Sequence, residues 1–129
     1  MGNVMVVKQF WFDAAHYLPD HPGKCKNLHG HRWMLEIGVK TSDGRLNDAG
    51  MVIDFGDLKR IVNERIIDKL DHTFINEVNL ECFPNECPTA ENMLDWFKFA
   101  LDGALPDNCE LALIRLWETT SSYAEWRDW

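Results

Sequence analysis

Three histidines near the start of the chain have the spacing of a metal site. His29 and His31 flank a single glycine in the segment KCKNLHGH, and His16 follows an alternating apolar run. If residues from about 29 to 40 form a strand, its two-residue period places both of these imidazoles on one face. Three protein ligands with an open fourth position are typical of catalytic zinc, whereas structural zinc sites usually have four. We therefore expect Zn²⁺ at His16, His29 and His31, although an H-x-H pair alone also occurs in ordinary cores.

Cys25 lies just ahead of the two closely spaced histidines. A neighbouring cation stabilises the thiolate, which is the basic and nucleophilic form of cysteine. We expect this thiol to take part in the chemistry. The remaining cysteines, Cys82, Cys87 and Cys109, form no C-x-x-C motif and are expected to be reduced. Cys82 and Cys87 lie in a predicted loop and are expected to be incidental.

The size and charge of the chain exclude several classes of function. Its 129 residues are enough for one domain with a real core, and we expect residues 1–129 to form it. A net charge of −8 argues against nucleic-acid binding, which needs a basic surface. No apolar stretch approaches membrane-spanning length, and the opening MGNVMVVKQFWF lacks a secretory layout. We therefore expect a cytoplasmic protein.

The apolar pattern predicts an α+β fold. Strands are expected over residues 4–12, 30–41, 109–119 and 122–126. One helix follows Asp54 as its N-cap and carries an apolar stripe to Leu70. A second helix follows Thr89 as its N-cap and ends at Pro106. The order ββααββ predicts an antiparallel sheet with both helices packed on one face.

An open sheet of this kind has two edges that natural proteins pair, cover or charge. The chain also contains six tryptophans and seven phenylalanines, more than one thin core needs. Interfaces are enriched in aromatic residues, so we expect a homo-oligomer whose sheets join edge to edge. The alternative is that these side chains only fill the space between helices and sheet.

Segments along nearly the whole chain together resemble one known family. They are FDAAH, CKNLHGH, VIDFGDLK, LDHTFIN, PTAENM and LWETTSSYAEW, in that order. The chain resembles the 6-pyruvoyltetrahydropterin synthase superfamily, and most closely its bacterial 6-carboxytetrahydropterin synthase branch, which serves queuosine biosynthesis. The resemblance implies the T-fold, a ββααββ unit that trimerises into a barrel and often stacks as a hexamer.

The resemblance also implies roles for individual residues. It implies zinc ligands at His16, His29 and His31, an active thiol at Cys25, a partner pair at Asp71 and His72, a pterin-anchoring carboxylate at Glu118, and further substrate contacts at Thr89 and Glu91. The family site lies between subunits, so these groups need not come from one chain.

Local chemistry qualifies some of these roles. Neighbours on a regular helix or strand point apart, so we expect Asp71 to act through an interface or the backbone rather than directly on His72. Glu118 shares the strand parity of Ile114 and Leu116, which argues against a mere surface carboxylate. Helix capping explains Thr89 and Glu91 as well as substrate contact does.

The implied reaction is a zinc-dependent lyase reaction. Its substrate is 7,8-dihydroneopterin triphosphate, and its products are 6-carboxy-5,6,7,8-tetrahydropterin, acetaldehyde and triphosphate. The nearest alternative is elimination of triphosphate to give 6-pyruvoyltetrahydropterin on the same fold with the same metal and thiol. A more remote alternative is a zinc-binding assembly protein without catalysis, which would have no need of the thiol.

Overall fold

Two long antiparallel strands form the centre of the fold. The computed structural model describes residues 4–129, so the Met1–Asn3 end of the predicted domain lies outside it. Strand β1 (Val6–His16) pairs with β2 (His29–Thr41) along its whole length, and His16 lies directly opposite His29. His31 follows two residues later on the same face of β2. The register alone therefore gathers the three histidines at one end of the sheet.

Three further strands complete a mixed sheet in the order β3-β1-β2-β4-β5. Strand β4 (Cys109–Thr119) pairs antiparallel with β2, and β5 (Ser122–Arg127) pairs antiparallel with β4. The two-residue strand β3 (Thr73–Phe74) runs parallel to the end of β1. The predicted sheet is confirmed, with this short parallel strand as an addition that periodicity could not predict.

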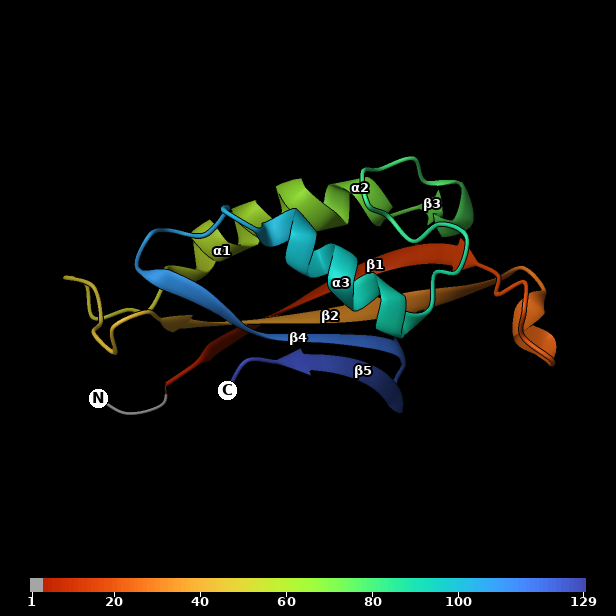
Figure 1. Ribbon diagram of the computed structural model, residues 1–129. Helices are drawn as coiled ribbons and strands as arrows, with labels where there is room; N and C mark the ends of the chain where they lie inside the picture. The colour runs from red at the N-terminus through yellow and green to blue at the C-terminus, as the bar shows by residue number, and fades with distance from the viewer. Residues whose placement is uncertain (1–3) are drawn as a thin grey trace.

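The helices lie on one face of the sheet (Figure 1). Helix α1 (Phe55–Val62), a π-helical turn η2 (Asn63–Ile67) and α2 (Asp68–Leu70) follow one another without a break. Helix α3 (Ala90–Leu101) crosses beside them, and the 3₁₀ turns η1 (Lys24–Lys26) and η3 (Ile75–Glu77) lie in loops. No helix within residues 4–129 has the length and apolarity needed to span a bilayer.

The core lies between the helical layer and the covered face of the sheet. Alternate residues of β2 are fully buried there, as the strand period predicts: Trp33, Leu35, Ile37 and Val39. Leu58, Ile66 and Leu70 cover them from the helices and are equally buried. Burial of each such side chain contributes about 1.5–3 kcal/mol, so the end of β2 that carries the histidines is held rigidly.

Two element ends differ clearly from the prediction, those of β1 and α3. Strand β1 continues four residues past Phe12 to His16, because its pairing with β2 continues to the end of both strands. Both predicted N-caps, Asp54 and Thr89, are confirmed by side-chain hydrogen bonds to the first turns of α1 and α3. Helix α3 ends at Leu101 and not at Pro106, because Asp102 is extended and Gly103 takes a positive φ of 71°.

Candidate metal centre and active site

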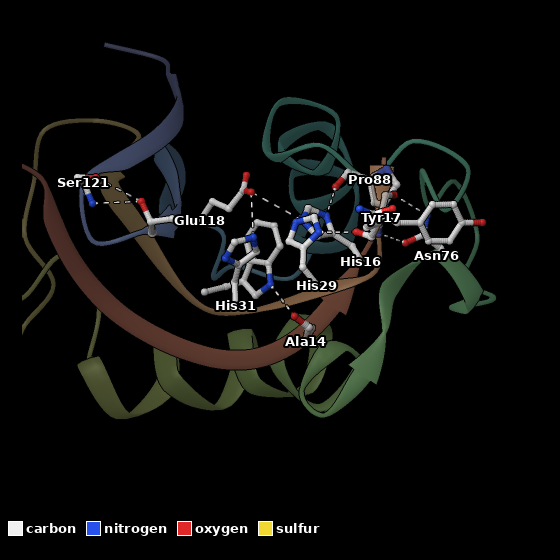
Figure 2. A network of polar contacts seen from close by, with 12 residues as sticks. Ala14, His16, Tyr17, His29, His31, Asn76, Pro88, Glu118 and Ser121 are labelled. Carbon is white, nitrogen blue, oxygen red and sulfur yellow. Dashed lines mark hydrogen bonds and ion pairs between the residues drawn. The ribbon is translucent and has the colours of Figure 1, made fainter. Parts of the chain in front are cut away.

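The three predicted histidines meet in one cluster. Their ring centroids lie 4.6 Å apart for His16 and His29, 4.8 Å for His29 and His31, and 5.4 Å for His16 and His31. One ligand atom from each lies within 4.8 Å of the others and of a carboxylate oxygen of Glu118. Figure 2 shows these side chains converging from β1, β2 and β4. This group can hold a metal ion.

Backbone carbonyls fix how two of the imidazoles point. His16 Nδ1 donates to the carbonyl of Pro88 at 3.0 Å, and His29 Nδ1 donates to the carbonyl of Asn27 at 2.7 Å. A carbonyl can only accept, so both rings carry a proton on Nδ1, and in the neutral imidazole Nε2 then has the lone pair free to bind a metal. Metal-binding histidines are typically oriented in this way. Sequence periodicity gave no sign of either carbonyl.

The inward-facing nitrogens support the same conclusion. Nε2 of His16, His29 and His31 are all buried, and none has a hydrogen-bond partner within residues 4–129. Unsatisfied buried polar atoms cost free energy, so a cluster of three calls for a ligand that satisfies them together. Burial also lowers the pKa of His31, against the opposing charge of Glu118, and so favours the neutral form that binds metals.

Glu118, the carboxylate that the resemblance assigns to the pterin, lies next to the histidines. Its Oε1 is 3.1 Å from His31 Nε2 and 3.7 Å from His16 Nε2, both within ion-pair range but without hydrogen-bond geometry at His31. Contact with His16, reinforced by the charge of His31, holds the pKa of the Glu118 carboxyl below its ordinary value. The carboxylate is therefore ionised beside the place where a metal or a substrate group would bind.

A cavity opens beside Glu118, between the first turn of α3 and strand β5. It has a volume of about 560 Å³, and Glu91, Glu118 and Tyr123 contribute to its lining. Three glutamates, Glu91, Glu118 and Glu125, therefore line one space next to the histidine cluster. Thr89 does not line this cavity, and its hydroxyl instead accepts a hydrogen bond from the Asn92 N–H at 3.1 Å.

Asp71 and His72 form a direct pair, contrary to the expectation that neighbouring side chains point apart. His72 adopts a positive φ of 61°, which breaks the regular geometry on which that expectation rested. Asp71 Oδ2 consequently lies 2.9 Å from His72 Nδ1. The backbone of Asp13 holds the pair from both sides: its N–H donates to Asp71 Oδ1 at 2.9 Å, and its carbonyl accepts from the His72 N–H at 2.6 Å.

The other end of the same segment is tied to β1 as well. Asn76 accepts a hydrogen bond from the Tyr17 N–H and donates one to the Tyr17 carbonyl, both at 2.9 Å (Figure 2). The chain from Asp71 to Asn76 therefore follows β1 from Asp13 to Tyr17. This arrangement fixes the Asp71–His72 pair to the strand that also carries His16.

The structure does not bring all the predicted residues together within one chain. Cys25 lies in η1, where its carbonyl accepts a hydrogen bond from the Leu18 N–H at 2.8 Å. Asp71 and His72 form a separate group with Asp13. Among the described residues, neither Cys25 nor this pair belongs to the closely spaced group around the three histidines.

The sheet, the helical layer and the histidine cluster define a T-fold protein with a metal-binding site, and comparisons with known proteins agree. The sequence description of the 6-pyruvoyl tetrahydropterin synthase family matches residues 5–128. The chain belongs to this family. A Haemophilus influenzae protein named 6-carboxy-5,6,7,8-tetrahydropterin synthase is 35% identical over an alignment of 144 residues, gaps included. The alignment covers 95% of this chain and 98% of that protein.

Further comparisons support the same family and fold. A Synechocystis protein with the same name is 34% identical over 102 residues, which cover 78% of this chain and 76% of that protein. The structure of Caenorhabditis elegans 6-pyruvoyl tetrahydropterin synthase superposes with a TM-score of 0.81 and 23% identity, covering 98% of this chain and 96% of that one. At 23% identity, this structural match supports the fold and no more.

Proposed function

We propose that the protein is a 6-carboxytetrahydropterin synthase of queuosine biosynthesis. It converts 7,8-dihydroneopterin triphosphate and one water to 6-carboxy-5,6,7,8-tetrahydropterin, acetaldehyde and triphosphate. The observation that carries this proposal is the buried cluster of His16, His29 and His31, with three unsatisfied Nε2 atoms next to an ionised carboxylate. Relatives matched over nearly their full length bear the name of this enzyme.

The donor set fits Zn²⁺ as the resident metal. Three neutral imidazoles leave the full positive charge on the ion, and such sites suit zinc in catalytic proteins. His16, His29 and His31 would hold the ion, while Glu118 lies at the open side of the cluster. Bound there, zinc would act as a Lewis acid toward the oxygens of the substrate side chain.

Proton transfer falls to residues outside this cluster. Cys25 is proposed as the general base that removes protons from the substrate side chain. His72 is proposed to accept and return protons, with its imidazole held by the Asp71 carboxylate 2.9 Å away. The Asp13 backbone keeps that carboxylate in place, so the pair presents one fixed imidazole face to a substrate.

Recognition of the pterin ring is proposed for the cavity beside α3. A carboxylate can accept two hydrogen bonds at once, one from the pterin amino group and one from a ring N–H. Glu118 is the proposed anchor, and Glu91 and Thr89 are the proposed further contacts. Support comes from the location of Glu91 and Glu118 in one cavity, whereas the Thr89 hydroxyl already caps α3.

The separation of the two groups of residues favours a site completed by another copy of the chain. Residues 1–129 are proposed to act as one catalytic domain of a trimer-based homo-oligomer. The proposed assembly is a hexamer. Strand β5 forms one open edge of the sheet. At the opposite edge, within residues 4–129, the outer side of β1 is paired with β3 only at Ala14 and Ala15. Such edges are suited to pairing with another subunit. Cytoplasmic residence, expected from the sequence, remains part of this proposal.

Product analysis tests the reaction. The zinc-loaded protein is incubated with 7,8-dihydroneopterin triphosphate, and the products are identified by mass spectrometry. Equal amounts of 6-carboxytetrahydropterin, acetaldehyde and triphosphate are expected. Formation of 6-pyruvoyltetrahydropterin without acetaldehyde would replace this assignment with the neighbouring synthase activity. Zinc binding with no turnover would favour the assembly protein without catalysis.

A further inference from the structure

A turn from a distant part of the chain accepts a hydrogen bond from the most buried of the three histidines. His16 has no exposed surface, and its Nδ1 donates to the carbonyl of Pro88, which lies 72 residues further along. The other anchored ring, His29, uses the carbonyl of Asn27, only two residues away. The orientation of His16 therefore depends on how accurately a distant turn is held.

Asn92 holds that turn. Its side-chain Nδ2 donates to the carbonyl of Cys87 at 2.9 Å, and the same carbonyl accepts the Thr89 N–H at 2.9 Å. The Asn92 backbone N–H donates in turn to the Thr89 hydroxyl at 3.1 Å. Both neighbours of Pro88 are thus tied to the first turn of α3, and the proline ring itself restricts φ. The Pro88 carbonyl has little freedom to move away from His16.

We infer that Asn92 is a positioning residue for the metal centre, acting on His16 through the turn from Cys87 to Thr89. The inference rests on the proposed metal site. A carbonyl that receives Nδ1–H sets both the tautomer and the ring orientation of a histidine ligand. Loss of the side-chain hydrogen bond to Cys87 would loosen that carbonyl and misdirect His16 Nε2.

Asn92 is also the third residue of α3, so a purely structural role has to be separated from positioning. The substitution Asn92→Asp makes this separation. A carboxylate near a helix N-terminus favours the helix dipole, and an added negative charge attracts a cation. Both effects predict equal or tighter metal binding. Aspartate cannot donate to the Cys87 carbonyl, however, so the positioning role predicts weaker binding.

The experiment measures Co²⁺ and Zn²⁺ affinity by competition with a chelator, on proteins shown to be folded by circular dichroism. Asn92→Asp and Asn92→Ala are each expected to weaken binding by roughly 10-fold, at the low end of what the loss of an outer hydrogen bond to a metal ligand costs. The absorption spectrum of bound Co²⁺ is expected to change in both variants, since the ligand geometry changes. If Asn92→Asp fails to fold, Asn92→Ala carries the test.

Two control variants test the other causes that could change metal binding, which are a loss of stability and a change at the surface of α3. Asp54→Ala removes the N-cap of α1, where the side chain accepts from Gly56 and Asp57, and so lowers stability away from the cluster. Asp95→Ala alters an exposed residue one turn further along α3. Both are expected to keep the wild-type metal affinity and Co²⁺ spectrum.

The outcomes separate the inference from the function on which it rests. Failure of the wild-type protein to bind either metal would overturn the proposed metal site and this inference with it. Wild-type affinity and spectrum in Asn92→Asp would overturn the inference alone. Equal loss of affinity in Asp54→Ala would assign the effect to stability and also overturn it. A nitrogen-15 NMR spectrum in which the His16 Nδ1–H signal weakens only in the Asn92 variants would support it.

Discussion

The Asp71 carboxylate lies 2.9 Å from Nδ1 of His72, its own neighbour in sequence, while its other oxygen accepts the Asp13 N–H. Such contact between adjacent side chains is possible because His72 has a positive φ. Sparsely populated backbone conformations of this kind persist where the surroundings enforce them, and they cluster at functional sites. Here two hydrogen bonds with the Asp13 backbone enforce it: the Asp13 N–H donates to the Asp71 carboxylate, and the Asp13 carbonyl accepts from the His72 N–H.

The substitution Asp71→Asn tests this pair. An asparagine oxygen can still accept the Asp13 N–H, but its NH₂ group then faces His72 Nδ1, donor against donor. The imidazole must change tautomer or turn away, so the rate should fall by roughly 10²–10⁴-fold if the ring transfers protons. Steady-state kinetics together with zinc analysis check this. Unchanged kcat with full zinc content would remove the pair from the reaction.

The same pair predicts a pH dependence of stability. The hydrogen bond from the Asp13 N–H, helped by His72, lowers the pKa of Asp71 in the folded state. The unfolded chain therefore takes up the proton first as the pH falls, and the stabilising effect of Asp71 is complete only above the ordinary value of about 3.9. It is lost as the pH falls through the lowered pKa.

Urea unfolding of the wild type and Asp71→Asn between pH 3 and pH 6 checks that prediction. The difference in free energy of unfolding should be constant at the upper end and shrink at the lower end. A difference that grows on acidification would contradict the assigned hydrogen bond.

His29→Ala should release the metal. The variant removes one of three converging Nε2 atoms, and two imidazoles bind zinc far more weakly than three. Bound zinc should fall well below one per chain, and turnover should be lost while the chain still folds. His21→Ala is the matched control, because His21 lies in an exposed loop and its Nδ1 accepts from the Gly23 N–H. Full metal occupancy in His29→Ala would exclude His29 as a ligand.

Cys25→Ala should separate metal binding from proton transfer. Cys25 lies outside the group around the histidines, so zinc content and oligomeric state should be unchanged. The rate should fall by roughly 10²–10⁴-fold, the usual contribution of a general base. Cys82→Ala, which alters an exposed cysteine, serves as the control. Normal turnover in Cys25→Ala would refute the role of this thiol.

Glu118→Gln distinguishes a pterin anchor from a metal ligand. An amide would place a donor against a pterin donor, so an anchoring role predicts weaker pterin binding with zinc content unchanged. The 3.1 Å contact with His31 Nε2 makes zinc affinity the second quantity to measure. Calorimetric titration with pterin and chelator competition for zinc give the two values. Wild-type values for both would leave Glu118 without a role in either.

Much of the site follows from sequence periodicity, because it lies on regular strands. Alternation correctly placed His29 and His31 on one face, and the same rule correctly joined Glu118 to the face of Ile114 and Leu116. The parallel strand at Thr73 and the π-helical turn at Asn63 were not predicted, since both depend on tertiary contacts rather than on a local repeat.

The remaining differences arise where side chains meet single backbone groups. The contact between Asp71 and His72 requires a φ value that no residue pattern revealed. The carbonyls of Pro88 and Asn27 that orient the histidines have no sequence signature, because every residue carries a carbonyl. The hydrogen bond from Asn92 to the turn that presents Pro88 was not predicted either, although Asn92 lies within the quoted segment PTAENM.

The distribution of the ligand atoms over β1, β2 and β4 has a consequence for the order of folding events. His16, His31 and Glu118 come together only after three strands from opposite halves of the chain have paired. Long-range pairings of this kind form slowly, and the unfolded chain offers no preassembled group of ligands. Metal added during refolding should therefore leave the folding rate nearly unchanged and act mainly by slowing unfolding.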